Sequence, residues 1–277
     1  MKTNVSRRNF FVKAGAFALG IATGSTFRPE GADARQEMPP APWPYAELDV
    51  ERVRKLGHLG YYERACSEGA FWALISSLAE EVGYPYTHVP TRIMAFGSGG
   101  VAGWSTLCGA VNGSCAAMSL IAEDAKPLCD ELLKWHVQTP FPMDQSNSYA
   151  QNHEFLVKKY KTDQALQQVT PTSPLCHVTV TRWCKESGYA SGDSERSERC
   201  ARMTGDVAAH AAQLLNALHA DAFRSEYSYI GNTKTCRSCH AKGKPFKTGG
   251  WTRGKMDCES CHGDRAKIVD MEHCEQR

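Results

Sequence analysis

The sequence predicts a mainly α-helical protein, in which a helical body is followed by a loop-rich C-terminal segment. Apolar residues recur at helical spacing in two stretches, residues 66–82 and 196–220. No stretch shows the sustained alternation of apolar and polar residues that a sizeable sheet requires. The final segment, residues 221–277, has few apolar side chains, so it cannot build a core of its own.

Residues 1–34 have the features of an export signal rather than of a folded domain. The run SRRNFFVK begins at Ser6, a short apolar stretch spans 14–23, and a small-x-small sequence occupies 32–34. The apolar stretch is too short and too rich in glycine for a membrane span. We expect a twin-arginine signal peptide, cleavage before Arg35, and a periplasmic mature protein without a membrane span. An uncleaved N-terminal anchor is the alternative.

Residues 35–220 are expected to form the helical body, which begins with a proline-rich, extended stretch at 35–50. In the first expected helix Leu74 and Leu78 fall on one face, and Gly83 stands where a helix C-cap belongs. The expected helices cover residues 66–82, 115–124, a stretch opened by Pro127, and 196–220. Residues 84–96 look irregular, and 139–169 are polar after two prolines and carry little chemical signal.

A glycine-rich run at residues 96–115 interrupts the helical pattern. It lacks the Lys-Ser/Thr of a phosphate loop, and no strand precedes it, so a nucleotide fingerprint is not indicated. Glycines permit unusual dihedral angles and close approach of the backbone. Around Cys108 they suit a ligand that brings bare backbone amides near sulfur. Close helix packing on Gly109 and Gly113 is a compatible alternative.

The C-terminal segment contains two C-x-x-C-H motifs, 22 positions apart. This spacing is the attachment site of a c-type haem, whose vinyl groups react with the two thiols while the histidine becomes the proximal iron ligand. The histidine argues against a thioredoxin-like pair, and its repetition at the same offset argues against zinc. We therefore expect two haem c per chain in a loop-rich c-type dihaem segment. The residues are Cys236, Cys239 and His240, and Cys258, Cys261 and His262.

Eight of the twelve cysteines lie outside these motifs. Thiolates favour soft metals, and four of them suit an iron–sulfur cluster, although the wide spacings match no ferredoxin pattern. Disulfides, which the periplasm permits, are the alternative. The twin-arginine route favours the cluster, because it carries folded proteins that already hold a cofactor. The candidate ligands are Cys66, Cys108, Cys176, Cys184 and Cys200, and Cys115, Cys129 and Cys274 are interpreted as small apolar residues.

Three histidines are candidates for the distal haem ligands. His219 ends the helix that leads into the tail, His58 lies in an aromatic, glycine-flanked stretch, and His177 follows Cys176. Methionine ligation is the alternative and would raise the reduction potential.

Charge excludes one class of partner. Residues 1–34 hold five of the 32 cations and two of the 30 anions, which leaves 27 against 28 and a formal charge of −1. A near-neutral mature chain has no electrostatic footprint for nucleic acid.

The body resembles the C–GCAxxG–C–C redox family through Cys66-x-x-Gly69, Cys108-Gly-Ala-x-x-Gly113, Cys176 and Cys200, although Cys108 precedes Gly109 here. With the signal and the paired haem motifs added, the chain from residue 50 onward resembles the split-Soret cytochromes c. The resemblance implies a mostly helical homodimer with two bis-histidine haems per subunit, clustered near the subunit contact. It also implies a [2Fe–2S]-type centre on four of the five candidate cysteines.

The sequence thus favours a periplasmic electron-transfer dihaem cytochrome c that exchanges electrons with redox partner proteins. Closed axial positions suit a carrier better than a catalyst. A haem-containing reductase of a small molecule and a disulfide-stabilised haem sensor or scaffold are the alternatives.

Overall fold

The computed structural model describes residues 37–155, 157, 160–241, 250 and 252–263. The expected signal peptide, residues 1–34, lies outside the described residues, as does Cys274. The chain divides into two compact units, 1–38 and 39–277, and everything below concerns the second.

The prediction of a mainly α fold is confirmed. The described residues form helices and two isolated β-bridges, with no strand among them. The α-helices are α2 (Val50–Glu81), α3 (Gly109–Ile121), α4 (Lys126–Gln138), α5 (Asp144–Gln151), α6 (Cys176–Ser187), α7 (Ser194–His219), α8 (Thr233–His240) and α9 (Glu259–His262). Two 3-10 helices, η1 (Tyr86–His88) and η2 (Thr91–Gly97), occupy the stretch that looked irregular.

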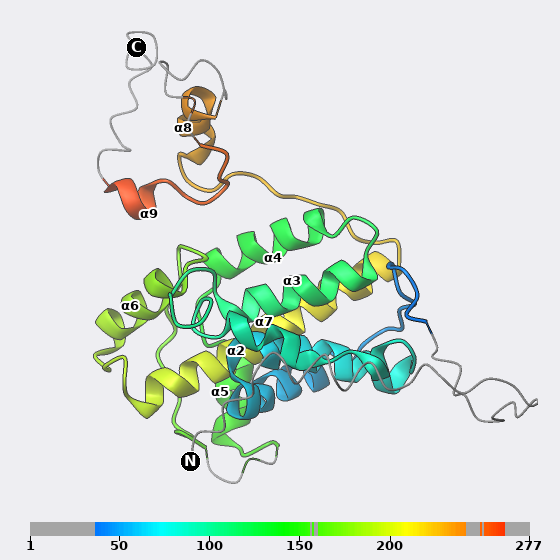
Figure 1. The fold of residues 1–277 in the computed structure, drawn as a ribbon. Helices are drawn as coiled ribbons and strands as arrows, with labels where there is room; N and C mark the ends of the chain where they lie inside the picture. Colours follow the sequence, from blue (N-terminus) through cyan, green and yellow to red (C-terminus); the bar gives the residue numbers. More distant parts are fainter. Residues whose placement is uncertain (1–36, 156, 158–159, 242–249, 251, 264–277) are drawn as a thin grey trace, which may run out of the picture. The chain divides into compact units, whose positions relative to one another are not determined.

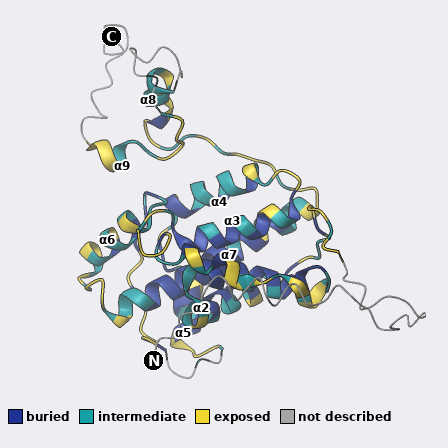
Figure 2. Cartoon of the chain, viewed as in Figure 1, coloured by how far each residue is buried: buried dark blue, intermediate teal, exposed yellow. Residues whose placement is uncertain are grey.

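Helices α2 and α7 form the centre of the body, and α3, α4 and α5 pack against α7 (Figures 1 and 2). The two long helices approach closely because glycine faces glycine: a Cβ on Gly57 would lie 2.9 Å from the Gly205 Cα. Apolar side chains such as Leu74 and Val207 are fully buried around this crossing. Burial of this apolar stripe supplies the main stabilisation of both helices.

Helix α2 is longer than expected and is interrupted. Asp49 caps it by accepting hydrogen bonds from the N–H groups of Glu51 and Arg52, and Ala65 breaks it with φ 61° and ψ −173°. Gly83 follows the helix with φ +83°, in the left-handed conformation expected of a glycine at this position. The break directly precedes Cys66, so it sets the direction of that side chain.

Helices α5 and α6 were not expected. In α6 only Thr179 and Trp183 are buried, so no apolar stripe marks it. Helix α5 buries the polar residues Ser146 and Asn147, which makes it look like a loop in sequence. Among the helices of the described residues, none has both the length and the apolar character needed to cross a bilayer.

Candidate metal and haem sites

Four cysteines from four helices gather where α2, α3, α6 and α7 meet. We call Cys66, Cys108, Cys176 and Cys200 the cysteine site. The Cys108 thiol interacts electrostatically with those of Cys66 and Cys176, and the Cys176 thiol interacts with those of Cys200 and Cys66. Cys108 and Cys200 are buried, and the other two are half-buried.

Two of these cysteines stand at helix N-termini that are held together. Cys108 is the N-cap of α3, and Cys176 is the first residue of α6. The Cys108 N–H donates to the Pro174 carbonyl at 2.8 Å, and the Cys176 N–H donates to the Thr106 carbonyl at 2.6 Å. The positive ends of both helix dipoles therefore lie beside sulfur, which stabilises thiolate over thiol.

Backbone N–H groups lie close to the sulfur atoms of Cys66 and Cys108. The N–H of Gly99 donates to Cys66, and the N–H groups of Ala110 and Val111 donate to Cys108. A Cβ on Gly109 would lie only 2.3 Å from the Cys66 Sγ. The glycine-rich run thus brings amides to sulfur, as the sequence suggested.

The same run also packs two helices closely. A Cβ on Gly113 would lie 2.0 Å from the Ser67 carbonyl oxygen, so only glycine allows α3 to approach α2 here. The run therefore both brings amides near sulfur and lets α3 pack closely on α2.

Burial raises the pKa of the Cys66, Cys108 and Cys176 thiols and so favours their protonated forms. It raises the pKa of Cys108 to about 12, with a further contribution from Cys66 and Cys176. It raises the pKa of Cys176 to about 11, and Arg199 and Arg196 oppose this rise. Metal binding at the site would therefore release protons.

The four thiols of the cysteine site do not all point at one central position. Among the described side chains, no three His, Cys, Asp or Glu residues are arranged to hold one metal ion. Cys184 lies two turns after Cys176 on α6, and Cys200 is the cysteine that influences its pKa. A dinuclear cluster spreads its four thiolates over two irons, so this arrangement suits it better than a single ion.

Each C-x-x-C-H motif lies on one helical turn. Cys236, Cys239 and His240 occupy positions i, i+3 and i+4 near the end of α8. In the second motif Cys258 is the N-cap of α9, and Cys261 and His262 follow at the same offsets. These offsets place all three groups on one helix face, as covalent haem attachment requires.

The two haem motifs are tied to each other by polar contacts. Asn232 donates to the Glu259 carboxylate at 2.6 Å, and the Thr252 N–H donates to the His240 carbonyl at 2.9 Å. The thiols of Cys236 and Cys258 interact. The two C-x-x-C-H motifs are therefore neighbours within one chain.

One cysteine of the two C-x-x-C-H motifs takes part in a disulfide bond. Cys239 is disulfide-bonded, whereas Cys236, Cys258 and Cys261 are free thiols. Attachment of haem through Cys239 requires that this bond be reduced first.

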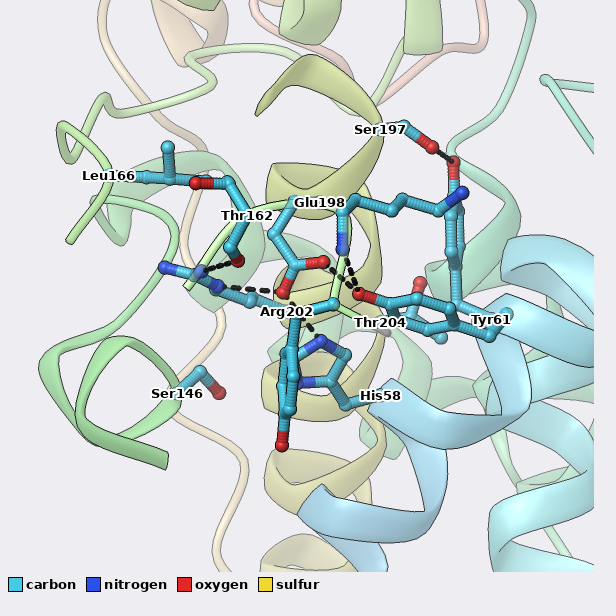
Figure 3. Close-up of polar contacts among 12 residues, drawn as sticks. His58, Tyr61, Ser146, Thr162, Leu166, Ser197, Glu198, Arg202 and Thr204 are labelled. Atoms are coloured by element: carbon cyan, nitrogen blue, oxygen red, sulfur yellow. Dashed lines mark hydrogen bonds and ion pairs between the residues drawn. The ribbon is translucent and has the colours of Figure 1, made fainter. Parts of the chain in front are cut away.

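The candidate distal histidines lie on three helices in different environments. His177 and His219 are exposed, and His219 contacts the Tyr45 ring with centroids 5.3 Å apart. His58 is buried, and its Nε2 lies 2.8 Å from Glu198 Oε1 (Figure 3). Ligation by His58 through Nε2 would require this contact to break.

Two features were missed in the sequence. Arg199 is fully buried beside the cysteine site, and the thiols of Cys115 and Cys129 contact each other between α3 and α4. Arg199 precedes Met203 and Val207 at helical spacing, so the apolar stripe of α7 could have indicated its burial. No spacing rule links Cys115 to Cys129.

Known proteins resemble this chain in sequence and in fold. A curated protein, "Split-Soret cytochrome c" of Desulfovibrio desulfuricans, is 29% identical over 280 residues, which cover 95% of this chain and 96% of the relative. A solved structure, described as "A novel iron centre in the split-Soret cytochrome c" of the same organism, matches with a TM-score of 0.72 at 28% identity. It covers 83% of this chain and 94% of the other.

A family model described as "Putative redox-active protein (C_GCAxxG_C_C)" matches residues 65–214. This range is more than half of the chain. It contains the whole cysteine site and ends before the haem motifs. The chain therefore belongs to the C_GCAxxG_C_C family.

Proposed function

We propose that this chain is a periplasmic electron-transfer protein that carries two c-type haems in its C-terminal segment and an iron–sulfur centre in its helical body. One observation carries the proposal: each C-x-x-C-H motif places two thiols and a histidine on one helix face, and the two motifs are neighbours. Similarity to a split-Soret cytochrome c along almost the whole chain supports it.

In the C-terminal segment the cysteines and the histidines have different roles toward haem. Cys236 and Cys239, and Cys258 and Cys261, fix each haem covalently, and His240 and His262 act as proximal ligands. Bound haem supplies one-electron redox chemistry at each motif. The contacts between α8 and α9 keep the two motifs at a fixed separation, which favours electron exchange between them.

Exposed histidines are the first candidates for distal ligands. His219 ends α7 directly before the tail, so it is our first choice, and His177 is the second. His58 is the third, because Glu198 already holds its ring. Bis-histidine ligation closes both axial positions, so the protein would carry electrons rather than bind a substrate.

The cysteine site provides the four thiolates of the proposed [2Fe–2S]-type centre. Cys66, Cys108, Cys176 and Cys200 are its ligands, and Cys184 is the reserve. The N–H groups of Gly99, Ala110 and Val111 and two helix N-termini offset negative charge on sulfur.

The proposed domain plan follows from this division. Residues 1–34 are a twin-arginine signal, 35–220 the iron–sulfur body, and 221–277 the dihaem segment. A segment this short cannot bury two haems, so we propose that a second copy of the chain covers them in a homodimer. Other redox proteins are the expected electron partners.

Metal and haem analysis of the exported protein tests the proposal. We expect two covalently bound haems per chain, non-haem iron with acid-labile sulfide, and a low-spin spectrum without carbon monoxide binding after reduction. One haem or none would refute the dihaem assignment. Carbon monoxide binding would favour a small-molecule reductase, and a lack of non-haem iron would favour a disulfide-stabilised body.

A further inference from the structure

Arg199 is a buried cation without a partner. Its side chain is fully buried in α7, and its Nε, Nη1 and Nη2 atoms have no hydrogen-bond partner within the described part of the chain. A charge removed from water without compensation is among the most unfavourable arrangements in a protein. An anionic group that the polypeptide itself does not supply would remove this penalty.

The neighbouring arginines show what this fold does with other buried guanidinium groups. Arg202, one turn away and equally buried, pairs with Glu198 at 3.0 Å (Figure 3) and donates to Asn147 Oδ1 at 2.6 Å and the Gln164 carbonyl at 2.8 Å. Arg54 pairs with Asp206 at 2.5 Å. Arg199 differs from both, because among the described residues no carboxylate pairs with it.

The Arg199 charge acts on two sets of side chains, the thiols of the cysteine site and the ring of His136. Arg199 directly precedes Cys200, and its charge opposes the rise that burial causes in the pKa of Cys176 and Cys184, so the guanidinium is near enough to act on these thiols. It also acts on His136 of α4, which is fully buried with both ring nitrogens unpartnered among the described residues. Burial, and then Arg199, lowers the pKa of His136 to about 3, so the ring is neutral. His136 therefore supplies no counter-charge.

We propose that Arg199 is the counter-cation of an anionic iron–sulfur centre bound at the cysteine site, and that it sets the reduction potential of that centre. This inference rests on the proposed function. Four thiolates and two sulfides outweigh the charge of two ferric ions, so the group is anionic when oxidised and more so after one electron is added. Arg199 is a positioning residue that donates to sulfur and stabilises the reduced form more than the oxidised form.

Arg199→Met removes the charge while retaining an apolar side chain of moderate length. We expect the ratio of reduced to oxidised centre at a fixed potential to fall at least tenfold, which is a downward shift of about 59 mV for one electron. Arg199→Lys keeps the charge and should retain most of the wild-type potential. The readouts are a redox titration followed by electron paramagnetic resonance, and non-haem iron and sulfide per covalent haem.

Arg182→Met is the control. Arg182 lies on α6, the helix that begins with Cys176, but its side chain is exposed and pairs with Glu186 at 2.8 Å. Solvent screens its charge, so the potential should shift much less than in Arg199→Met.

Thermal unfolding of the body separates charge compensation from ordinary packing. With the centre present, Arg199→Met should unfold at a lower temperature than wild type. After a chelator removes the non-haem iron, the order should reverse, because wild type then retains a bare buried guanidinium. Lower stability of Arg199→Met in both forms would indicate a packing role and overturn the inference.

The remaining outcomes are also decisive. Wild-type iron content and potential in Arg199→Met would overturn the role of Arg199 and leave the proposed function standing. Covalent haem without non-haem iron in the wild type would overturn both this inference and the iron–sulfur part of the proposed function. If Arg199→Met does not accumulate, Arg199→Gln takes its place, and Arg199→Lys must still retain the centre.

Discussion

His58 Nε2 lies 2.8 Å from Glu198 Oε1 in the contact between α2 and α7, where both side chains are buried. Arg202 pairs with the same oxygen, and the Tyr62 hydroxyl donates to the other carboxylate oxygen. Glu198 therefore joins one side chain from each of two turns of α2 to α7. Both oxygens of the Glu198 carboxylate thus have hydrogen-bond partners, and the interior of the body contains a polar network centred on this group.

Replacing Glu198 by Gln should destabilise the body strongly. The change leaves Arg202 without its counter-charge and His58 without its carboxylate partner inside the protein, and breaking a buried pair such as Arg202–Glu198 costs about 3–5 kcal/mol. Denaturant unfolding followed by circular dichroism measures the loss. Glu186→Gln is the control, because Glu186 pairs with Arg182 at 2.8 Å on the surface and should cost less than about 1 kcal/mol. Equal losses in the two variants would contradict the assignment.

Acid should weaken the body through the same carboxyl group. Burial alone would raise the pKa of Glu198, but His58, Tyr62 and Arg202 outweigh it and hold the pKa below its ordinary value of 4.5. A depressed carboxyl pKa contributes stability above pH 4.5, and this contribution is lost as the pH falls further toward the folded-state pKa. Below about pH 4.5 wild type should therefore lose stability more steeply than Glu198→Gln in unfolding curves at successive pH values. Parallel curves would show that Glu198 is not the responsible group.

The fold could be predicted wherever burial is apolar. Residues 66–82 and 196–220 form helices as expected, and their apolar side chains belong to one hydrophobic core. Helix α5 was invisible, since Ser146 and Asn147 are buried through hydrogen bonds to Asp206 and to the Leu166 carbonyl. Helical periodicity in sequence records apolar burial and cannot record polar burial of this kind.

The cysteine site was predictable as a set of residues but not as an arrangement. Residue type and compartment pointed to five cysteines, whereas the grouping of four depends on the pairing of Leu107 with Leu175 across an isolated bridge. This long-range contact brings two helix N-termini together, and no local spacing encodes it. Arg199 was missed for a related reason, because an unpartnered buried charge is visible only when its surroundings are known.

Gly109→Ala should prevent assembly of the proposed iron–sulfur centre. The added Cβ would lie 2.3 Å from the Cys66 Sγ and 2.9 Å from the Gly97 carbonyl oxygen, so the thiol must move. Non-haem iron should fall to less than half of wild type, while covalent haem stays unchanged. Gly192→Ala is the control, since a Cβ there meets nothing within 4 Å. Normal iron content in Gly109→Ala would mean that Cys66 is not a ligand.

Cys258→Ala should remove one anchoring thiol of the proposed second haem. We expect the covalently bound haem to fall from two per chain toward one, because a single thioether leaves the haem poorly retained. Haem staining after denaturing electrophoresis and the pyridine haemochrome spectrum give the count. Cys184→Ala should leave the count at two, and a full count in Cys258→Ala would refute the assignment of the second motif.

The contact between Cys115 and Cys129 should make these two thiols unequal in reactivity. Both lie outside the cysteine site and the C-x-x-C-H motifs. A hydrogen bond from Cys115 lowers the pKa of Cys129, and the same contact, followed by burial, raises the pKa of Cys115. Because the thiolate is the nucleophile, brief alkylation at about pH 8 should modify Cys129 several-fold faster than Cys115. Cys115→Ala removes the donor, so it should slow the modification of Cys129 even though it opens the site. Peptide mapping by mass spectrometry gives both rates, and faster modification of Cys129 in this variant would show that access rather than thiolate stability controls the reaction.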